Sequence, residues 1–263
     1  MQLSGIFVYP IKACGGIALE HAELVERGLA YDRRYMLVDQ AGTFISQREV
    51  PQLCLVDTAF EGERLLVSAA NKETLELPRR PAELSQPRQP YRIWDDVGSA
   101  CEHVAGSRWF SELLNDDVKL LYMPDSERRQ VNPKRARPAD IVSFADAYPL
   151  LLMSEASLRD LNARLPEPVE MRRFRPNLVL SGGPPYAEDE LVRFRVGELP
   201  FRGVKRCERC VVITVDPSTG QRGLEPLRTL ARYRLEANSV WLGMNVIHDG
   251  PGTMRVGDRV SVG

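Results

Sequence analysis

The chain of 263 residues has no long apolar run and few cysteines. No window approaches the roughly 20 apolar residues that a membrane-spanning helix needs. Its first residues, Met1–Pro10, lack the basic start and the apolar stretch of a secretory signal. The five cysteines form an odd and sparse set, so we do not expect a disulfide framework. These absences predict a cytoplasmic protein in a reducing compartment, without a membrane partner.

The sequence also lacks an excess of charge of either sign. The net charge is −1, so no overall attraction to nucleic acid is expected, and we predict no nucleic-acid partner. Only three histidines occur, scattered at His21, His103 and His248, which gives little support to histidine acid–base catalysis. Most positive charge comes from arginine, whose planar fork suits phosphate and carboxylate, so local anion sites remain open.

The pattern of apolar residues indicates many short strands and few helices. Helices are expected at Ser107–Leu114, after Ser154 as N-cap, and from Glu225-Pro226 with proline in the first turn. Such a mixture predicts a mixed α+β, β-rich fold with a barrel, not a βαβ sheet. The expected strands are Leu3–Tyr9, Tyr35–Asp39, Arg64–Ser68, Val118–Met123, Asn177–Ser181, Val192–Val196, Val211–Val215, Val240–His248 and Met254–Val262.

Three segments look irregular. Leu77–Pro90 is crowded with proline, arginine and glutamine and is expected to be a loop. Ser181–Pro185 is rich in glycine but lacks GxGxxG, so we interpret it as a turn. Pro124–Asp140 is polar, proline-containing and basic; it is either a mobile surface loop, or a lid or docking strip near an anionic ligand or an acidic partner.

Cys207-Glu208-Arg209-Cys210 is the strongest local motif. A structural zinc site usually needs two such pairs, and only one is present. A thioredoxin-type pair normally opens a helix, whereas this pair leads into an expected strand, Val211–Val215. Spacing alone leaves four readings open: zinc, redox exchange, two unrelated cysteines, or a thiolate that ligates a soft transition metal.

The segment from Cys207 to Gly220 closely resembles the signature of MOSC-domain proteins, among them amidoxime-reducing proteins and bacterial relatives that reduce N-hydroxylated bases. The resemblance extends over nearly the whole chain. It includes, in order, Tyr9–Lys12, Asp32–Tyr35, Leu152–Leu158, Phe174–Asn177, Tyr186–Asp189, Glu225–Leu227 and Pro251–Thr253. Several ordered matches are more specific than any one of them.

This resemblance implies a MOSC β-barrel with an additional N-terminal MOSC-associated β/α domain. The N-terminal region is expected at 1–120, with its first strands able to complete the barrel, and the MOSC domain at 121–263. The resemblance also implies the molybdenum–molybdopterin cofactor, with Cys210 as the catalytic residue and molybdenum ligand. The implied activity is a molybdenum-dependent reductase that removes oxygen from N-hydroxylated bases and amidoximes, a detoxifying reaction. In such an enzyme the cofactor carries the chemistry and the protein binds and orients.

The resemblance further places residues around the cofactor. The expected cofactor-binding residues are Lys12, Arg33, Asp146, Ala147, Tyr148, Arg175, Glu208, Arg209 and Asn245. Arginine can clamp a phosphate with two hydrogen bonds, and lysine adds a point charge. Ala13, Ala147, Tyr148 and Asn245 depart from the family pattern, which puts the substrate range in doubt more than cofactor binding.

Electrons for a reductase must come from elsewhere. No Cys-x4-Cys-x2-Cys spacing of a plant-type ferredoxin occurs, so we expect a separate donor protein: a ferredoxin, a flavoprotein or a cytochrome b5-like protein. Two alternatives remain. The chain could carry sulfur as a persulfide on Cys210, supplied by a partner sulfurase because no pyridoxal-phosphate lysine motif is evident. It could also bind or store the cofactor without turnover.

Overall fold

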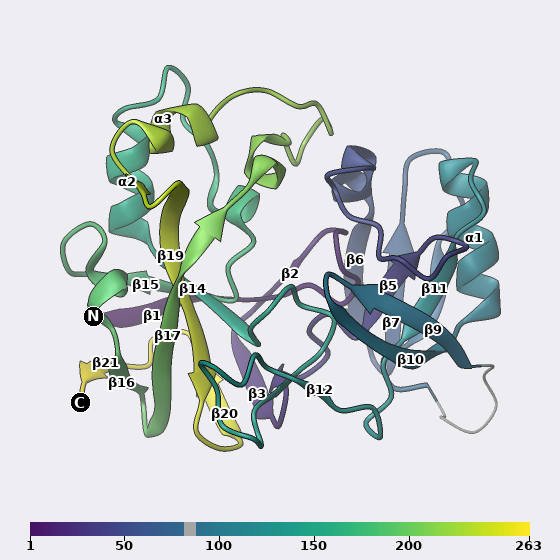
Figure 1. The fold of residues 1–263 in the computed structure, drawn as a ribbon, viewed down its shortest axis with the longest axis horizontal. Coiled ribbons are helices and arrows are strands. Elements are labelled where there is room, and N and C mark those ends of the chain that lie inside the picture. The colour runs from purple at the N-terminus through teal and green to yellow at the C-terminus, as the bar shows by residue number, and fades with distance from the viewer. Residues whose placement is uncertain (82–87) are drawn as a thin grey trace.

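A nine-stranded sheet forms one part of the molecule (Figure 1). The computed structural model describes residues 1–81 and 88–263. The strand order is β2-β1-β15-β14-β19-β17-β16-β21, and β18 pairs with β19. The members are β1 (Gln2–Val8), β2 (Ile17–Leu19), β14 (Leu150–Ser154), β15 (Leu178–Ser181), β16 (Arg193–Val196), β17 (Leu199–Arg209), β18 (Leu235–Glu236), β19 (Ser239–His248) and β21 (Val260–Val262).

Apolar side chains of this sheet form the largest core. Buried residues of β1, β14 and β19, such as Leu3, Leu152 and Val246, meet in a single cluster. The first strand joins this sheet through β15, with Ile6 opposite Leu178. The first two strands, β1 and β2, are therefore built into a sheet whose remaining strands come from the second half of the chain.

The second part of the molecule is built from residues 35–122 (Figure 1). It has a four-stranded sheet in the order β5-β11-β10-β9 and a three-stranded meander β6-β7-β8. Helix α1 packs Trp109 and Phe110 into the core beside Leu120 of β11. The elements are β5 (Tyr35–Val38), η1 (Pro51–Leu55), β6 (Asp57–Glu61), β7 (Arg64–Ser68), β8 (Leu75–Pro78), β9 (Arg88–Ile93), β10 (Asp96–Glu102), α1 (Val104–Leu114) and β11 (Lys119–Tyr122).

The remaining elements are short. Strand β3 (His21–Val25) pairs with β4 (Gly28–Leu29) and with β20 (Gly252–Arg255), and β12 (Arg129–Gln130) pairs with β13 (Ile141–Val142). The helices of the second half are α2 (Glu155–Asn162), η3 (Met171–Phe174), η4 (Ala187–Glu190), η5 (Val211–Thr214) and α3 (Leu227–Ala231). None of the helices in the described part of the chain is long and apolar enough to cross a membrane.

The expected mixed α+β, β-rich fold is confirmed. Ser154 caps α2 as predicted, because its Oγ accepts a hydrogen bond from the amide of Ser157 at 3.1 Å. Pro226 precedes α3 as its cap and not as its first residue. Met254–Val262 is not one strand but the end of β20, a turn and β21.

The expected strand Val211–Val215 is wrong. These residues form the short helix η5 over Val211–Thr214, and Cys210 is its N-cap. Thr214 Oγ1 donates to the carbonyl of Val211 at 2.7 Å, which closes the turn locally. The argument that the cysteine pair leads into a strand therefore fails; the pair instead lies where the long strand β17 ends.

Two of the three segments expected to be irregular, Leu77–Pro90 and Pro124–Asp140, differ in how far they match expectation. In Leu77–Pro90, β8 ends at Pro78 and β9 begins at Arg88, and residues 82–87 lie outside the described residues. Pro124–Asp140 is largely irregular but contains β12. Its charges are mostly engaged: Arg128 pairs with Glu26, and Arg137 with Asp249. Whether the strip docks an acidic protein stays a prediction.

Candidate functional site

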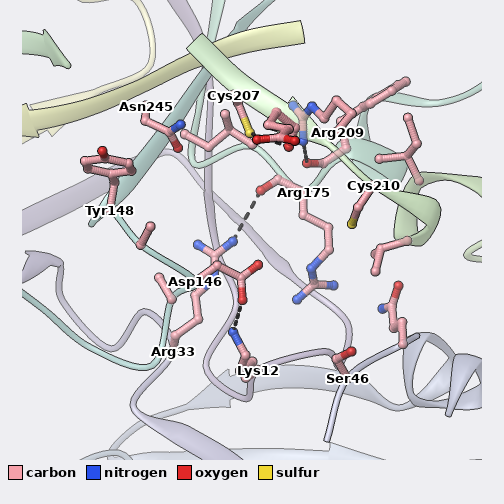
Figure 2. Close-up of a pocket in the computed structure, with 18 of the residues that line it drawn as sticks. Lys12, Arg33, Ser46, Asp146, Tyr148, Arg175, Cys207, Arg209, Cys210 and Asn245 are labelled. Atoms are coloured by element: carbon pink, nitrogen blue, oxygen red, sulfur yellow. Dashed lines mark hydrogen bonds and ion pairs between the residues drawn. The ribbon is translucent and has the colours of Figure 1, made fainter. Parts of the chain in front are cut away.

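A cavity of about 530 Å³ is lined by residues from both parts of the molecule. Its volume is in the range of small-molecule and cofactor sites. Figure 2 shows side chains from distant segments converging on it. Every site residue named from the sequence lines this cavity: Lys12, Arg33, Asp146, Ala147, Tyr148, Arg175, Glu208, Arg209, Cys210 and Asn245.

The wall of the cavity is strongly positive. It contains seven cationic side chains and two carboxylates, a formal excess of five positive charges in a chain whose net charge is −1. Charges of one sign in a cleft with low-dielectric walls attract a ligand of the opposite sign. The cations are Lys12, Arg33, Arg48, Arg173, Arg175, Lys205 and Arg209, and the carboxylates are Asp146 and Glu208.

Lys12 and Asp146 form an ion pair in the cavity (Figure 2). The backbone of Lys12 is tied to Tyr35, and its Nζ donates to the carbonyl of Phe144 at 2.9 Å and to Oδ1 of Asp146 at 2.5 Å. Burial lowers the pKa of Lys12. Burial also acts to raise the pKa of Asp146, but Lys12, with lesser contributions from Arg48 and Arg33, outweighs it and holds that pKa at about 2. The Asp146 side chain is 59% exposed, which leaves its second oxygen free to accept from a ligand.

Arg33 and Arg175 are organised around one buried tyrosine. Both guanidinium groups lie over the ring of Tyr9, with their central carbons 4.3 and 4.2 Å from its centroid. Arg33 donates to Asp32 at 2.6 Å and Asn177 at 2.8 Å, and Arg175 donates to the carbonyl of Cys14 at 2.6 Å. Each arginine has five N–H donors, so both retain donors for a ligand.

The segment 145–148 presents backbone to the cavity. Arg129, which is buried, donates to the carbonyls of Ser143 at 2.9 Å and Asp146 at 2.9 Å and also to that of Ala145. In the described part of the chain, the amides of residues 146–148 have no hydrogen-bond acceptor. Since Arg129 holds the carbonyl side of this segment, its N–H groups are available to a ligand. Sequence reasoning did not identify Arg129, which belongs to no motif.

The Cys210 sulfur lies at the cavity wall beside a cation that sequence reasoning also missed. Nη2 of Arg48 is 3.2 Å from this sulfur, and the Arg48 guanidinium lies over the ring of Trp94 at 4.6 Å. Arg222 holds the Arg48 loop from the opposite side by donating to the carbonyls of Gln47 and Arg48. No spacing in the sequence links positions 48, 94 and 210, so only the fold could identify this cluster.

The other residues of the cysteine segment have more structural contacts. The Arg209 guanidinium donates to the carbonyls of Leu242 at 2.8 Å and Phe174 at 3.1 Å. These two hydrogen bonds fix the position of the cysteine segment. Glu208 accepts from Oγ of Ser239 at 2.7 Å. Cys207 is half-buried in the cavity wall, and burial raises the pKa of its thiol.

The chemistry of the cavity fits a large anion that brings its own metal donors. A thiolate is a soft ligand for a transition metal. The described residues contain no group of three His, Cys, Asp or Glu side chains able to hold a metal ion, so zinc held by the protein alone is not supported. Arg173, a lining residue, donates to Asp216 from Nη2, and its buried Nε has no hydrogen-bond partner in the described structure.

Comparison with known proteins gives matches along nearly the whole chain. Residues 1–117 match the MOSC N-terminal beta barrel domain, and residues 139–261 match the MOSC domain. The chain is 33% identical to human mitochondrial amidoxime-reducing component 1 and 35% identical to the mouse protein; 97% of the chain is covered, with 81% and 80% of those proteins. It is 32% identical to the tomato molybdenum cofactor sulfurase over 98% of the chain but only 35% of that protein.

Proposed function

Because the chain belongs to the family of MOSC-domain proteins that also carry a MOSC N-terminal domain, we propose that it is a molybdenum-cofactor-dependent reductase of N-hydroxylated compounds. The observation that carries the proposal is a half-buried thiol, Cys210, at the wall of a cavity with five excess positive charges. The proposed substrates are amidoximes and N-hydroxylated bases, and the proposed electron source is a separate donor protein.

The residues present fit the cofactor. Cys210 would ligate the metal. Lys12, Arg33 and Arg175 would hold the phosphate, because they are cationic, face the cavity and keep unused donors. The free amides of residues 146–148 would donate to the pterin, and the open oxygen of Asp146 would accept from its N–H groups.

The bound cofactor would supply the two-electron couple that breaks an N–O bond. For a hydroxylamine, the overall change takes up two electrons and two protons and gives an amine and water. The chain's own groups would bind and orient the reactants. Asp146 stays ionised beside Lys12, so it serves as a hydrogen-bond acceptor and not as a proton donor. Arg48, in contact with the Cys210 sulfur, keeps positive charge next to the ligating thiolate.

Metal and pterin analysis tests this proposal. Wild type, Cys210→Ala and Cys207→Ala are purified from a host that makes the cofactor. We expect about one molybdenum per chain in wild type and in Cys207→Ala, and loss of the metal in Cys210→Ala. Benzamidoxime reduction with an artificial donor should follow the metal content. Metal-free wild type that still reduces benzamidoxime would refute the proposal, as would Cys210→Ala that keeps both metal and activity.

A second candidate function is sulfur transfer through a persulfide on Cys210. The similarity to a molybdenum cofactor sulfurase and the accessible sulfur of Cys210 favour it. In this reaction a sulfurase persulfide passes its outer sulfur to the Cys210 thiol, and the sulfurase thiol is regenerated. Intact mass after incubation with a persulfide donor would then rise by roughly 32 daltons in wild type and not in Cys210→Ala. A carrier would show this adduct without any reductase activity.

A further inference from the structure

The turn between β9 and β10 displays an aromatic ring at the cavity. Ile93 pairs with Asp96, so Trp94 and Asp95 form a two-residue hairpin loop. Trp94 lines the cavity, yet its side chain is 50% exposed. Large aromatic side chains are usually more deeply buried than this, and such exposure at a cavity calls for an explanation.

The backbone of Trp94 is strained. Its φ is +54°, in the left-handed region, where glycine is preferred at the first position of such a hairpin loop. A bulky residue with this conformation is uncommon, and strain of this kind clusters at ligand-binding sites. Glycine would adopt this conformation without strain, so a tryptophan at this position has an energetic cost for the turn.

Two contacts hold the ring beside the metal-ligating thiol. The indole and the Phe44 ring form a T-shaped contact, with centroids 5.0 Å apart. The Arg48 guanidinium lies over the indole at 4.6 Å, and the same guanidinium donates to the Cys210 sulfur at 3.2 Å. A single guanidinium group therefore spans the space between the indole ring and the sulfur. The guanidinium covers one side of the indole, so a flat ligand whose N–O group lies near the sulfur would stack on the part of the ring that stays exposed at the cavity.

We propose that Trp94 is a specificity-determining residue that stacks planar, π-delocalised N-hydroxylated substrates at the cavity. This inference rests on the proposed function and names the substrate class for the same site. The stacking of an aromatic ligand on an indole tolerates different substituents on the ligand, because it uses only the flat face of the ligand. Aromatic amidoximes and N-hydroxylated bases would thus be preferred over saturated analogues of similar size.

Equilibrium binding without a reductant tests this inference. The ligands are benzamidoxime and cyclohexanecarboxamidoxime, which share the N-hydroxylated group and differ in the planarity of the ring. Titration calorimetry is done on wild type, Trp94→Gly, Trp94→Phe and Val97→Ala, all cofactor-loaded. Glycine removes the ring and relaxes the strained turn, so Trp94→Gly should fold, with a melting temperature no more than roughly 2 °C below that of wild type. Val97 is an exposed residue of the same hairpin that does not line the cavity, and it serves as the matched control.

We expect Trp94→Gly to bind benzamidoxime about tenfold more weakly, equivalent to about 1.4 kcal/mol, and the saturated ligand within about twofold of wild type. Trp94→Phe should recover most of the affinity, and Val97→Ala should match wild type. Equal weakening of both ligands, or an unchanged ratio of their dissociation constants, overturns the inference.

Turnover on the same preparations separates this inference from the proposed function. Loss of aromatic selectivity in Trp94→Gly, in a protein that reduces neither oxime, would leave the stacking role standing and remove the reductase function. If wild type and Trp94→Gly reduce both oximes with the same ratio of kcat/KM, the reductase function would stand and the stacking role of Trp94 would fall.

Discussion

Replacing Arg129 with methionine should destabilise the protein far more than the same change at the neighbouring Arg128. Arg129 is 5% exposed and donates to three backbone carbonyls of the segment that lines the cavity. Hydrogen bonds from a charged donor are each worth about 1.5–3 kcal/mol, and removal leaves three acceptors short of a partner, while the cost of burying the charge disappears. We therefore expect a loss of about 3 kcal/mol. The ion pair with Asp96 adds little, because that carboxylate is 50% exposed.

Urea denaturation followed by circular dichroism and tryptophan fluorescence measures this loss. For a chain of this size the urea m-value is near the upper end of the usual range, about 3 kcal/mol/M, so the midpoint should fall by about 1 M. Arg128 pairs with Glu26 at the surface, and Arg128→Met should move the midpoint by less than about 0.2 M. Arg129→Lys should be intermediate, because a single ammonium cannot serve all three carbonyls. Equal midpoints for Arg129→Met and Arg128→Met would refute this account of the segment.

Two further predictions concern the same region. Asp146 has a pKa of about 2 in the folded protein, below the value of about 3.9 in an unfolded chain, so its contribution to stability is present above about pH 4 and is lost as the pH falls towards 2. The difference in unfolding free energy between wild type and Asp146→Asn should shrink over that interval, and a constant difference would contradict the prediction. Gly243 has φ +80°, and an added Cβ would lie 2.7 Å from the carbonyl oxygen of Leu152. Gly243→Ala should therefore lower the free energy of unfolding by about 2–4 kcal/mol, which a lower melting temperature would show. An unchanged melting temperature would contradict the prediction, because β14 and β19 would then move apart at little cost.

Local signals in the sequence were reliable where the interaction itself is local. Ser154 was recognised as an N-cap, and its side chain caps the helix three residues on. The β-branched run at Val211–Val215 was misjudged, because strand propensity reflects packing beside neighbouring strands, and this segment has a single isolated bridge, from Val215 to Arg222. The long strand β17 was not anticipated, since its alternation is interrupted by Gly203 and by a bulge on either side of Lys205.

The cavity was predicted in part. Residues of the resembling motifs, such as Lys12, Arg175 and Cys210, all line it, although their roles remain predictions. Arg48 was missed because its contact with Cys210 spans 162 positions of sequence, and Trp94 because it meets Arg48 only in the fold; no local pattern encodes either contact. The docking role of the basic strip around Arg128 stays a prediction, and the structure adds that Arg128 pairs with Glu26 at the surface, which a count of charges does not reveal.

The pairing of β1 with β15 has a consequence for how the protein is made. Ile6 lies opposite Leu178, so the first strand emerges from the ribosome long before its partner β15 exists, although β2 follows it at once. At roughly 5–20 residues per second, the edge of β1 that pairs with β15 waits on the order of 10–30 seconds. The wall of the cavity that carries Lys12 is therefore completed only after the second half of the chain has been translated.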